Sequence, residues 1–422
     1  MTQPSYSADD RPAGEGYQAG LRRFFERHRS TWELGGIWLV LRLVTFVWAA
    51  LVSPLHAITP VEQMVPLWPP STPLLRWLER TLLAPWFRRD AVNHVGIVVN
   101  GYRLDDGSTQ FHPLFAWLAK PIYWLFGHPT LALLVVSSLA TIALLIIFEQ
   151  LVLLDLESHT ARTATLLFIF SPPAFILFAP YTESLFLLWA VLCLFWARKQ
   201  RWWLAGLAGA LATLTRQQGI FLLFPLAWEL WQVAGRNPRR ALAGWRDWLA
   251  LTLIPGGLLF WVAYRAVALN DVRPDYSSLQ AFVYSVIISP ASSKVVPVQA
   301  FWLPWRALWF ALNNLWAQFH ISVAIDLVLG AGFLLLLGLA WRHMRVSYRI
   351  YAVIIVLVSF AYHTGPFLPY MGLPRHLLLA FPVFIGLGPV LRYRWQRLLM
   401  VGLGLFGMLF LLMLYVIRGW VP

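Results

Sequence analysis

Four charged residues stand at polar breaks in an otherwise apolar chain, and their types suit chemistry on a phosphate-bearing substrate. Asp90 follows two bulky aromatic residues, where a carboxylate can have its pKa tuned to that of a general base. Glu183 follows a helix that "SPPAF" should break. Arg216 and Arg375 lie at the ends of separate apolar runs, and a guanidinium holds phosphate in planar, bidentate geometry. The two arginines would suit a lipid-linked phosphate whose tail lies in the bilayer.

Each of these residues also has a plainer interpretation. Asp90 could do no more than pair with Arg88 or Arg89 in a solvated loop. Thr182 or Glu183 could simply begin the next helix as its N-cap. Either arginine, taken alone, could extend its side chain to lipid headgroups. The spacing of these residues leaves both interpretations open.

Other kinds of chemistry have little support in the sequence. His94, His112 and His376 are too scattered for a metal signature, and a structural role is the better interpretation for each. The chain has no Walker loop and no G-x-S-x-G motif, and its one G-x-G-x-x-G match, residues 402–407, lies inside a predicted membrane span instead of following a strand. This argues against a soluble nucleotide donor and against a serine hydrolase.

The composition is that of a polytopic membrane protein. Of 422 residues, 59% are hydrophobic and 12% are charged, whereas soluble domains have roughly 25% charged residues. The formal charge of +14 fits basic cytoplasmic loops that face anionic headgroups better than it fits nucleic-acid binding. The single cysteine, Cys193, lies in an apolar run and excludes an intrachain disulfide.

Eleven segments have about the length and apolar character of membrane-spanning helices. Residues 1–30 are polar and are predicted to be a disordered cytoplasmic tail, and residues 31–422 are predicted to form one transmembrane domain. The predicted segments are 36–54, 130–153, 161–179, 182–197, 202–215, 218–234, 247–268, 321–341, 349–363, 377–391 and 398–417.

Lysine and arginine in the connections predict the orientation, because cytoplasmic loops carry an excess of these residues. If the helices alternate, five basic clusters share one side, which we expect to be the cytoplasm: residues 22–29, 198–201, 236–246, 342–349 and 392–397. Alternation requires that residues 111–128, with Lys120-Pro121 at their centre, form a re-entrant or interfacial helix. Two long loops, 55–129 and 269–320, then lie on the extracytoplasmic face with all four charged residues.

Several stretches together resemble the GPI mannosyltransferase II (PIG-V) family of integral-membrane glycosyltransferases. "RDAVNHVGIVVNGY" resembles the family's first-loop motif, which opens on an aspartate and ends in Gly-Tyr, and "FHPLFAWLAK" resembles its F-F-P-L-Y-P segment. The closest similarity runs from "FSPPAF" through "APYTESLF" and "WWLAG" to "TRQQG", and "PRHLLLAFPVF" resembles a late arginine-containing segment. The resemblance extends in order over most of residues 36–391.

The resemblance implies the type C glycosyltransferase (GT-C) fold, with about 11 transmembrane helices and interfacial helices in the first extracytoplasmic loop. It further implies a polyprenyl-phosphate-linked donor such as polyprenyl-phosphate mannose, no tightly bound cofactor, and inverting transfer on the extracytoplasmic face. In this hypothesis Asp90 is the base, while Arg216 and Arg375 bind the donor phosphate. Tyr181 and Glu183 would position the acceptor or the base. The scheme requires no metal and leaves open a divalent ion beside Asp90.

The sequence departs from the family pattern beside the expected base. Arg89 replaces an aromatic residue, Asn93 and His94 replace the following aromatic positions, and His112 stands in place of the second phenylalanine of F-F-P. These departures bear on acceptor and sugar specificity, so Asn93 and His94 are expected near the acceptor.

Arg88, Arg89, His112 and Gln217 are expected to support the first loop. The short loops favour a bacterial member that glycosylates a glycolipid or cell-surface glycan. A transporter or flippase, or a catalytically silent scaffold, are the alternatives. The polar residues clustered on one face argue against a transporter, which needs a midplane site.

Overall fold

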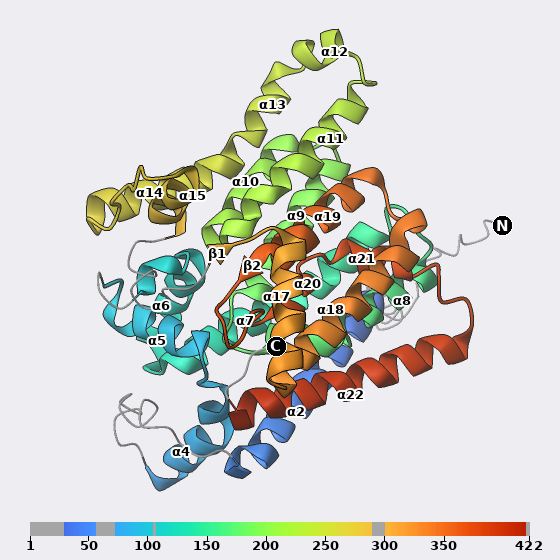
Figure 1. Ribbon diagram of the computed structural model, residues 1–422. Coiled ribbons are helices and arrows are strands. Elements are labelled where there is room, and N and C mark those ends of the chain that lie inside the picture. The colour runs from blue at the N-terminus through green and yellow to red at the C-terminus, as the bar shows by residue number, and fades with distance from the viewer. Residues whose placement is uncertain (1–28, 56–71, 104–106, 289–299, 419–422) are drawn as a thin grey trace, which may run out of the picture.

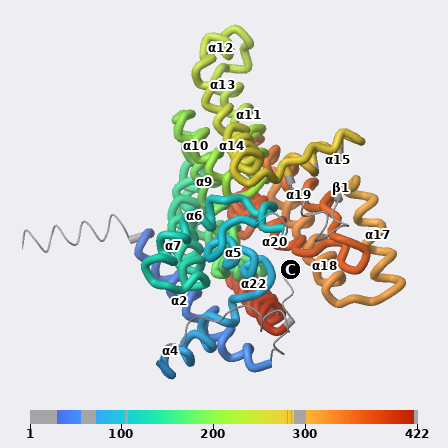
Figure 2. Tube along the Cα trace, turned by 90° about the vertical axis from the view of Figure 1, so that its left-hand side faces the viewer, coloured from blue at the N-terminus to red at the C-terminus, as the bar shows by residue number. Residues whose placement is uncertain are grey.

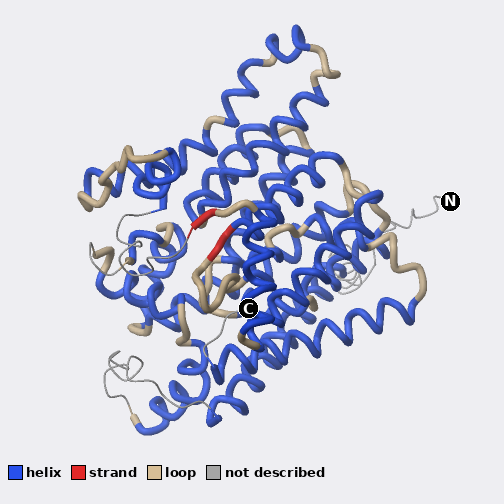
Figure 3. Tube along the Cα trace, viewed as in Figure 1, coloured by secondary structure: helices blue, strands red, loops and turns tan. Residues whose placement is uncertain are grey.

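The computed structural model describes residues 29–55, 72–103, 107–288 and 300–418, and the chain in these ranges is almost entirely helical (Figure 1, Figure 3). The predicted all-α architecture is thereby confirmed. The predicted disordered tail, 1–30, lies outside the described residues except for its last two, which begin the first helix.

The described chain contains the following regular elements, in order. The helices are α2 (Arg29–Val52), α4 (Pro73–Leu78), α5 (Asp90–Asn100), α6 (Leu114–Phe126), α7 (Pro129–Val152), α8 (Ser158–Ile169), α9 (Glu183–Arg198), α10 (Trp202–Thr215), α11 (Leu223–Val233), α12 (Pro238–Ala243), α13 (Trp245–Leu251), α14 (Leu253–Ala268), α15 (Leu279–Val283), α17 (Pro304–Ala317), α18 (Ile321–Ala340), α19 (Val346–Ala361), α20 (Leu373–Leu378), α21 (Pro382–Leu387) and α22 (Arg394–Arg418). Tighter or wider turns are η1 (Ser53–Leu55), η2 (Glu79–Leu83), η3 (Ala84–Trp86), η4 (Ser108–Gln110), η5 (Pro172–Phe178), η6 (Gln217–Leu222), η7 (Tyr284–Ile288) and η8 (Trp341–His343). The strands are β1 (Ala300–Phe301) and β2 (Tyr362–His363).

Five helical segments of the described chain are long and apolar enough to cross a membrane, or six if one bent pair counts as a span. The five are Ser30–Leu55, Pro129–Val152, Trp245–Ala268, Ile321–His343 and Arg394–Ile417. The other predicted segments are helical but shorter or broken. The protein is thus a multi-pass membrane protein, and the number of eleven spans stays a prediction.

Prolines break two segments that the sequence predicted as continuous. Residues 161–179 divide into α8 and η5, which meet at an angle of 80° where Ser171 precedes two prolines. Residues 377–391 contain the end of α20 and then α21, with Pro382 at the start of the second helix. Proline lacks a backbone N–H and crowds the preceding turn, so a helix rarely continues through it.

The described helices separate two chemically different ends of the bundle. Helix α9 begins at Glu183 and ends at Arg198, and its 16 residues span about 24 Å at the α-helical rise. Helix α10 returns from Trp202 to Thr215, directly before Arg216. We call the end that holds Arg198 the basic end. The positive-inside rule predicts that the basic end faces the cytoplasm.

Ion pairs join several connections at the basic end. Asp155, after α7, pairs with Arg198 and lies 3.3 Å from the Nη1 atom of Arg345. Arg162 of α8 lies 2.8 Å from an oxygen of Glu149 on α7. These contacts tie α7, α8, α9 and the start of α19 together at one level.

The first-loop helices pack on the other half of α7. Helix α6 has 13 residues, about 20 Å of helix, which is less than the roughly 30 Å of a bilayer core. It forms a separate hydrophobic cluster with α5 and α7, built around buried Phe115, Val98 and Leu133. Figures 1 and 2 both place α5 beside α6. This cluster holds α5, whose first residue is Asp90, against α6 and α7.

A two-residue antiparallel ribbon, which the sequence did not predict, ties the second long loop to the bundle. Ala300 pairs with His363, and Phe301 pairs with Tyr362. The adjacent Trp302 ring stacks on His363 with 3.9 Å between centroids. The ribbon thereby places Phe301 and Tyr362 at the end of α19, opposite the basic end.

Because α14 packs closely on α10, a methyl group should be tolerated at one of two neighbouring glycines and not at the other. A Cβ atom on Gly257 would lie 2.7 Å from the carbonyl oxygen of Ala210, whereas a Cβ on Gly256 would have nothing within 4 Å. We expect Gly257→Ala to lower the free energy of unfolding by about 1–3 kcal/mol, because backbone must shift. Gly256→Ala should be neutral or slightly stabilising. Thermal unfolding of both variants in detergent measures this, and equal midpoints would contradict the packing.

The orientation can be tested with single cysteines. Arg103 and Arg239 are both exposed and lie in connections predicted to face opposite sides, while native Cys193 is buried. A membrane-impermeant maleimide applied to intact cells should label Arg103→Cys and should spare Arg239→Cys until the cells are opened. The reverse pattern would place the first loop in the cytoplasm.

Candidate functional site

The site is built around the turn that precedes α5. Arg89 has φ 50° and ψ −119°, a conformation that side chains other than glycine rarely adopt. Holding such a residue costs on the order of 1–3 kcal/mol and requires support from the surrounding structure. The strained turn directs the chain into α5 with Asp90 as its first residue.

Three side chains hold this turn from behind. The hydroxyl of Tyr181 donates to the carbonyl oxygen of Arg88 at 3.1 Å, and the hydroxyl of Tyr415 donates to that of Trp86 at 2.8 Å. The Nε atom of Arg88 donates in turn to the carbonyl oxygen of Val416 at 3.2 Å. The last described helix, α22, therefore clamps the turn that carries Asp90.

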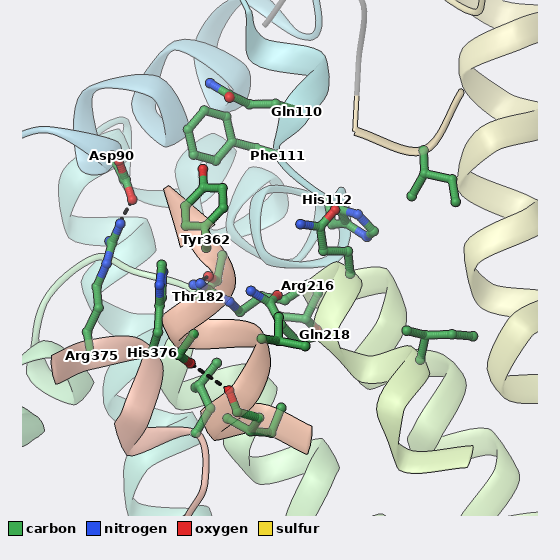
Figure 4. A pocket seen from close by; sticks show the side chains of 18 of the residues that line it. Asp90, Gln110, Phe111, His112, Thr182, Arg216, Gln218, Tyr362, Arg375 and His376 are labelled. Carbon is green, nitrogen blue, oxygen red and sulfur yellow. Dashed lines mark hydrogen bonds and ion pairs between the residues drawn. The ribbon is translucent and has the colours of Figure 1, made fainter. Parts of the chain in front are cut away.

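The four charged residues singled out in the sequence meet in one cluster, and Figure 4 shows three of them, Asp90, Arg216 and Arg375. We call Asp90, Arg375, Glu183 and Arg216 the charged cluster. Arg375 Nη1 lies 2.7 Å from Asp90 and 3.8 Å from Glu183. Arg216 Nη1 lies 2.7 Å from Glu183 and donates to the hydroxyl of Thr182 at 2.8 Å. Positive and negative side chains thus alternate along the cluster.

Local sequence explains how the two arginines reach the cluster. Arg216 begins a turn that folds back on α10, and a Cβ atom on Gly219 would lie 2.3 Å from the backbone nitrogen of Thr213. This contact accounts for the spacing of "TRQQG". Arg375 follows Gly372, which has φ +87° and would place a Cβ 2.5 Å from the Nε atom of Arg375. A side chain at either glycine would displace its arginine.

Charge and burial set the protonation of the first-loop groups. Burial raises the pKa of Asp90, but the charge and hydrogen bond of Arg375, together with the charge of Arg216, outweigh it and hold that pKa below its ordinary value. Burial lowers the pKa of His94 to about 4. Burial also raises the pKa of Tyr181 well above its ordinary value. At neutral pH the site therefore holds an ionised Asp90 beside a neutral His94.

A cavity of about 610 Å³ opens in front of the charged cluster. One wall is charged, with Asp90, Arg216 and Arg375. The remaining polar lining is mainly uncharged, and aromatic side chains complete it; these groups include Asn93, Gln110, Phe111, His112, Gln217, Gln218, Phe221, Phe301 and Tyr362. A cavity with a charged wall and an uncharged polar wall suits a substrate that carries both an anion and hydroxyl groups.

The structure brings most of the predicted site residues to this cavity. Asp90, Asn93, His94, Arg89, His112, Arg216, Gln217 and Arg375 line it. Tyr181 and Arg88 instead lie behind the turn, and Glu183, which has no exposed side-chain surface, reaches the cavity through the two arginines.

Other functional candidates were missed in the sequence. Tyr415 stands in an apolar helix with no nearby motif. His376, expected to be structural, lines the cavity next to Arg375. Gln218 could have been found from its place in the turn after Arg216. Among the described residues, no three His, Cys, Asp or Glu side chains are grouped so that they could hold a metal ion.

Comparison with solved structures identifies the class of fold. ArnT from Cupriavidus metallidurans bound to undecaprenyl phosphate superimposes with a TM-score of 0.50 and 13% sequence identity, over 88% of this chain and 62% of ArnT. The apo form of ArnT gives a TM-score of 0.45 with 16% identity, over 80% of this chain and 62% of ArnT. An oligosaccharyltransferase from Archaeoglobus fulgidus, tethered to an acceptor peptide, gives a TM-score of 0.39 with 13% identity, over 90% of this chain and 55% of the oligosaccharyltransferase. The chain has the GT-C fold and spans 62% of the length of ArnT.

A sequence comparison matches part of the chain to a family. The family model described as mannosyltransferase (PIG-V) matches residues 38–234, which include Asp90, Glu183 and Arg216. The family resemblance seen in the motifs is confirmed over this segment. No curated protein matches the chain.

The charged cluster predicts an unequal cost of removing its members. Arg375→Gln leaves Asp90 and buried Glu183 without a shared partner, and breaking such a buried pair costs about 3–5 kcal/mol. Asp90→Asn should cost less, because Arg375 keeps Glu183. The double variant should be more stable than the sum of the two single losses predicts, by about 1–3 kcal/mol. Thermal unfolding of the four proteins at pH 7 measures this coupling, and strict additivity would contradict it.

The same variants should respond to pH in a defined direction. In the wild type, Asp90 has a lowered pKa and stabilises the fold until the pH falls through that value. Without Arg375, burial raises the pKa of Asp90, so the carboxyl takes up a proton at a higher pH than in the wild type. The gap in unfolding midpoint between wild type and Arg375→Gln should therefore narrow as the pH is lowered from 7. A gap that widens would show that the arginine does not hold Asp90 ionised.

Proposed function

We propose that this protein is an inverting glycosyltransferase that transfers mannose from a polyprenyl-phosphate donor to a hydroxyl group on the extracytoplasmic face. The observation that carries the proposal is the meeting of one cavity-lining carboxylate, Asp90, with two arginines in a membrane-embedded bundle. The family match supports mannose as the sugar. The undecaprenyl phosphate bound to ArnT supports a lipid-linked phosphate as the donor.

In the proposed reaction, the acceptor hydroxyl attacks the anomeric carbon from the side opposite the phosphate. Its oxygen forms the new bond to that carbon, and Asp90 takes its proton. The bond from the anomeric carbon to the phosphate oxygen breaks, and the electron pair leaves with the polyprenyl phosphate. Arg216 and Arg375 stabilise the charge that develops there. One carboxylate suffices because the phosphate departs without being protonated, and a single displacement inverts the anomeric configuration.

Arg375 has two partners in this scheme. Before the donor binds, it pairs with Asp90 at 2.7 Å and keeps that carboxylate a weak base. A bound phosphate competes for the guanidinium, and Asp90 then loses part of the charge that lowers its pKa. Asp90 thereby gains basicity when the donor is in place.

The remaining predicted residues act around the base. Asn93 and His94 lie three and four positions after Asp90 on α5, so they share its face of the helix and border the acceptor. Tyr181 positions the turn before Asp90. Glu183 fixes both arginines. The acceptor is a glycolipid or cell-surface glycan, since a hydroxyl group near the membrane surface meets a base at this level.

The proposal can be tested with purified protein, polyprenyl-phosphate mannose and membrane lipids extracted from the source cells. We expect transfer of radiolabelled mannose to lipid, with inverted configuration in the product. Asp90→Asn should lower kcat by about 10²–10⁴-fold because the base is lost. Asp247→Asn, a carboxylate outside the cavity lining, is the matched control and should retain activity.

Each other outcome has a definite meaning. Equal transfer by the wild type and Asp90→Asn would remove Asp90 as the base. Retention of configuration would overturn the single displacement. Failure of the wild type to transfer sugar from any polyprenyl-phosphate donor would favour a transporter or a silent scaffold.

A further inference from the structure

His112 is the cavity residue at which this chain carries an imidazole where the F-F-P pattern has a phenyl ring. It lies between Phe111 and Pro113 at the entry to α6 and lines the cavity with 5% of its surface exposed. A buried imidazole brings two nitrogen atoms whose hydrogen-bonding must be accounted for. A phenyl ring would bring none.

One nitrogen of His112 is committed to the end of a helix. The carbonyl oxygen of Thr213 lies in the last turn of α10, where the chain turns away before a backbone N–H can reach it. The Nδ1 atom of His112 lies 2.5 Å from this oxygen. A carbonyl oxygen accepts and never donates, so Nδ1 must carry the hydrogen atom. The neutral ring then has a lone pair at Nε2.

The ring is neutral and well held. Burial lowers the pKa of His112 to about 4, against the bond to Thr213, and the charges of Arg265 and Arg216 lower it further. The centroid of the buried Trp261 ring lies 6.0 Å from that of His112. Tyr264 in turn stacks on Trp261, with 5.8 Å between their ring centroids. In the described chain, the bond to Thr213 is the hydrogen bond that the imidazole makes. Nε2 is therefore an acceptor without a donor.

The surroundings of His112 indicate which kind of ligand group would donate a hydrogen bond to Nε2. His112 and Gln218 lie on the side of the cavity away from the Asp90–Arg375 pair, with Gln110 above them (Figure 4). An Nε2 lone pair repels phosphate and carboxylate oxygens, which carry no hydrogen atom at neutral pH. It accepts from a hydroxyl group. The Asp90–Arg375 pair and the hydrogen-bond acceptor of His112 thus lie on different sides of the cavity.

We propose that His112 recognises one hydroxyl group of the substrate by accepting its hydrogen bond at Nε2, and that this contact sets which sugar or acceptor is used. The inference rests on the proposed function for the identity of the substrate. With phosphate at the arginines and this hydroxyl at His112, the substrate is held at two points and can enter the cavity in one direction only.

The test combines isosteric variants with deoxygenated substrates. His112→Asn places an amide nitrogen near the position of Nδ1, so it can keep the bond to Thr213 while removing the Nε2 acceptor. His112→Gln retains an acceptor near the Nε2 position. His343→Asn, an exposed histidine outside the cavity lining, is the matched control. The probes are polyprenyl-phosphate mannose, its 2-, 3-, 4- and 6-deoxy forms, and acceptors that lack single hydroxyl groups.

For the wild type, removing the recognised hydroxyl should lower kcat/KM by about 10–100-fold, because the buried acceptor loses its partner. For His112→Asn, the deoxy substrate and the full substrate should have about the same kcat/KM. For His112→Gln, the deoxy substrate should still have the lower kcat/KM, by a smaller factor than in the wild type. A deoxy donor that shows this pattern assigns the hydroxyl to the donor sugar, and a deoxy acceptor assigns it to the acceptor. Equal penalties at every position in wild type and His112→Asn would overturn the inference.

A second readout separates this inference from the proposed function. The shift in unfolding temperature on adding each lipid-linked sugar measures binding without catalysis. Binding that depends on His112 and on one hydroxyl, in a wild type that transfers no sugar, would overturn the transferase while supporting the inference. Sugar transfer that does not depend on His112 would support the transferase and overturn the inference. A wild type that neither transfers nor binds any probe would overturn the transferase and the inference together.

Discussion

The cost of burying charge governs the architecture of this site. Glu183 has no exposed side-chain surface, and an isolated carboxylate in such a place would lose several kcal/mol of hydration. It is tolerated because Arg216 and Arg375 approach it from two sides, and Arg375 in turn holds Asp90. The alternation makes four charges into one unit. Every helix that contributes a member must therefore end at the same level.

The surrounding fold supplies those helix ends. Helix α9 begins at Glu183, α10 ends just before Arg216, and α5 begins at Asp90. Breaks in the chain produce these helix ends, since "SPPAF", "TRQQG" and the glycine before α20 stop or redirect helices ahead of a charged residue of the cluster. At the basic end, Asp155 and Arg162 hold neighbouring helices in register. Helix length between the two ends then sets the height of the charged cluster.

The sequence was sufficient to predict much of this arrangement. Alternating spans and polar breaks placed Asp90, Glu183, Arg216 and Arg375 on one face, and the structure joins all four. Periodicity could not show that Asp90 pairs with Arg375 instead of its neighbours Arg88 and Arg89. That pairing depends on how α20 lies against α5, which is a tertiary property.

Other features left no local signal in the sequence. The ribbon of Ala300–Phe301 with Tyr362–His363 joins segments about sixty residues apart and is only two residues long. The hydrogen bond from His112 to Thr213 depends on where α10 ends, which is set by a close approach at Gly219. Tyr415 sits among apolar residues of a spanning helix and looks like any interfacial aromatic residue.

Because α22 holds the turn before Asp90, the site depends on the order in which the parts of the chain are synthesised. A ribosome makes the first loop early, but the contacts of Tyr415 and Val416 with that turn come from the last described helix. Until α22 has entered the membrane, the strained conformation at Arg89 lacks part of its support. A partly synthesised chain would hold Asp90 and the two arginines without this support for the turn. The site is completed only when nearly all of the described chain is in place.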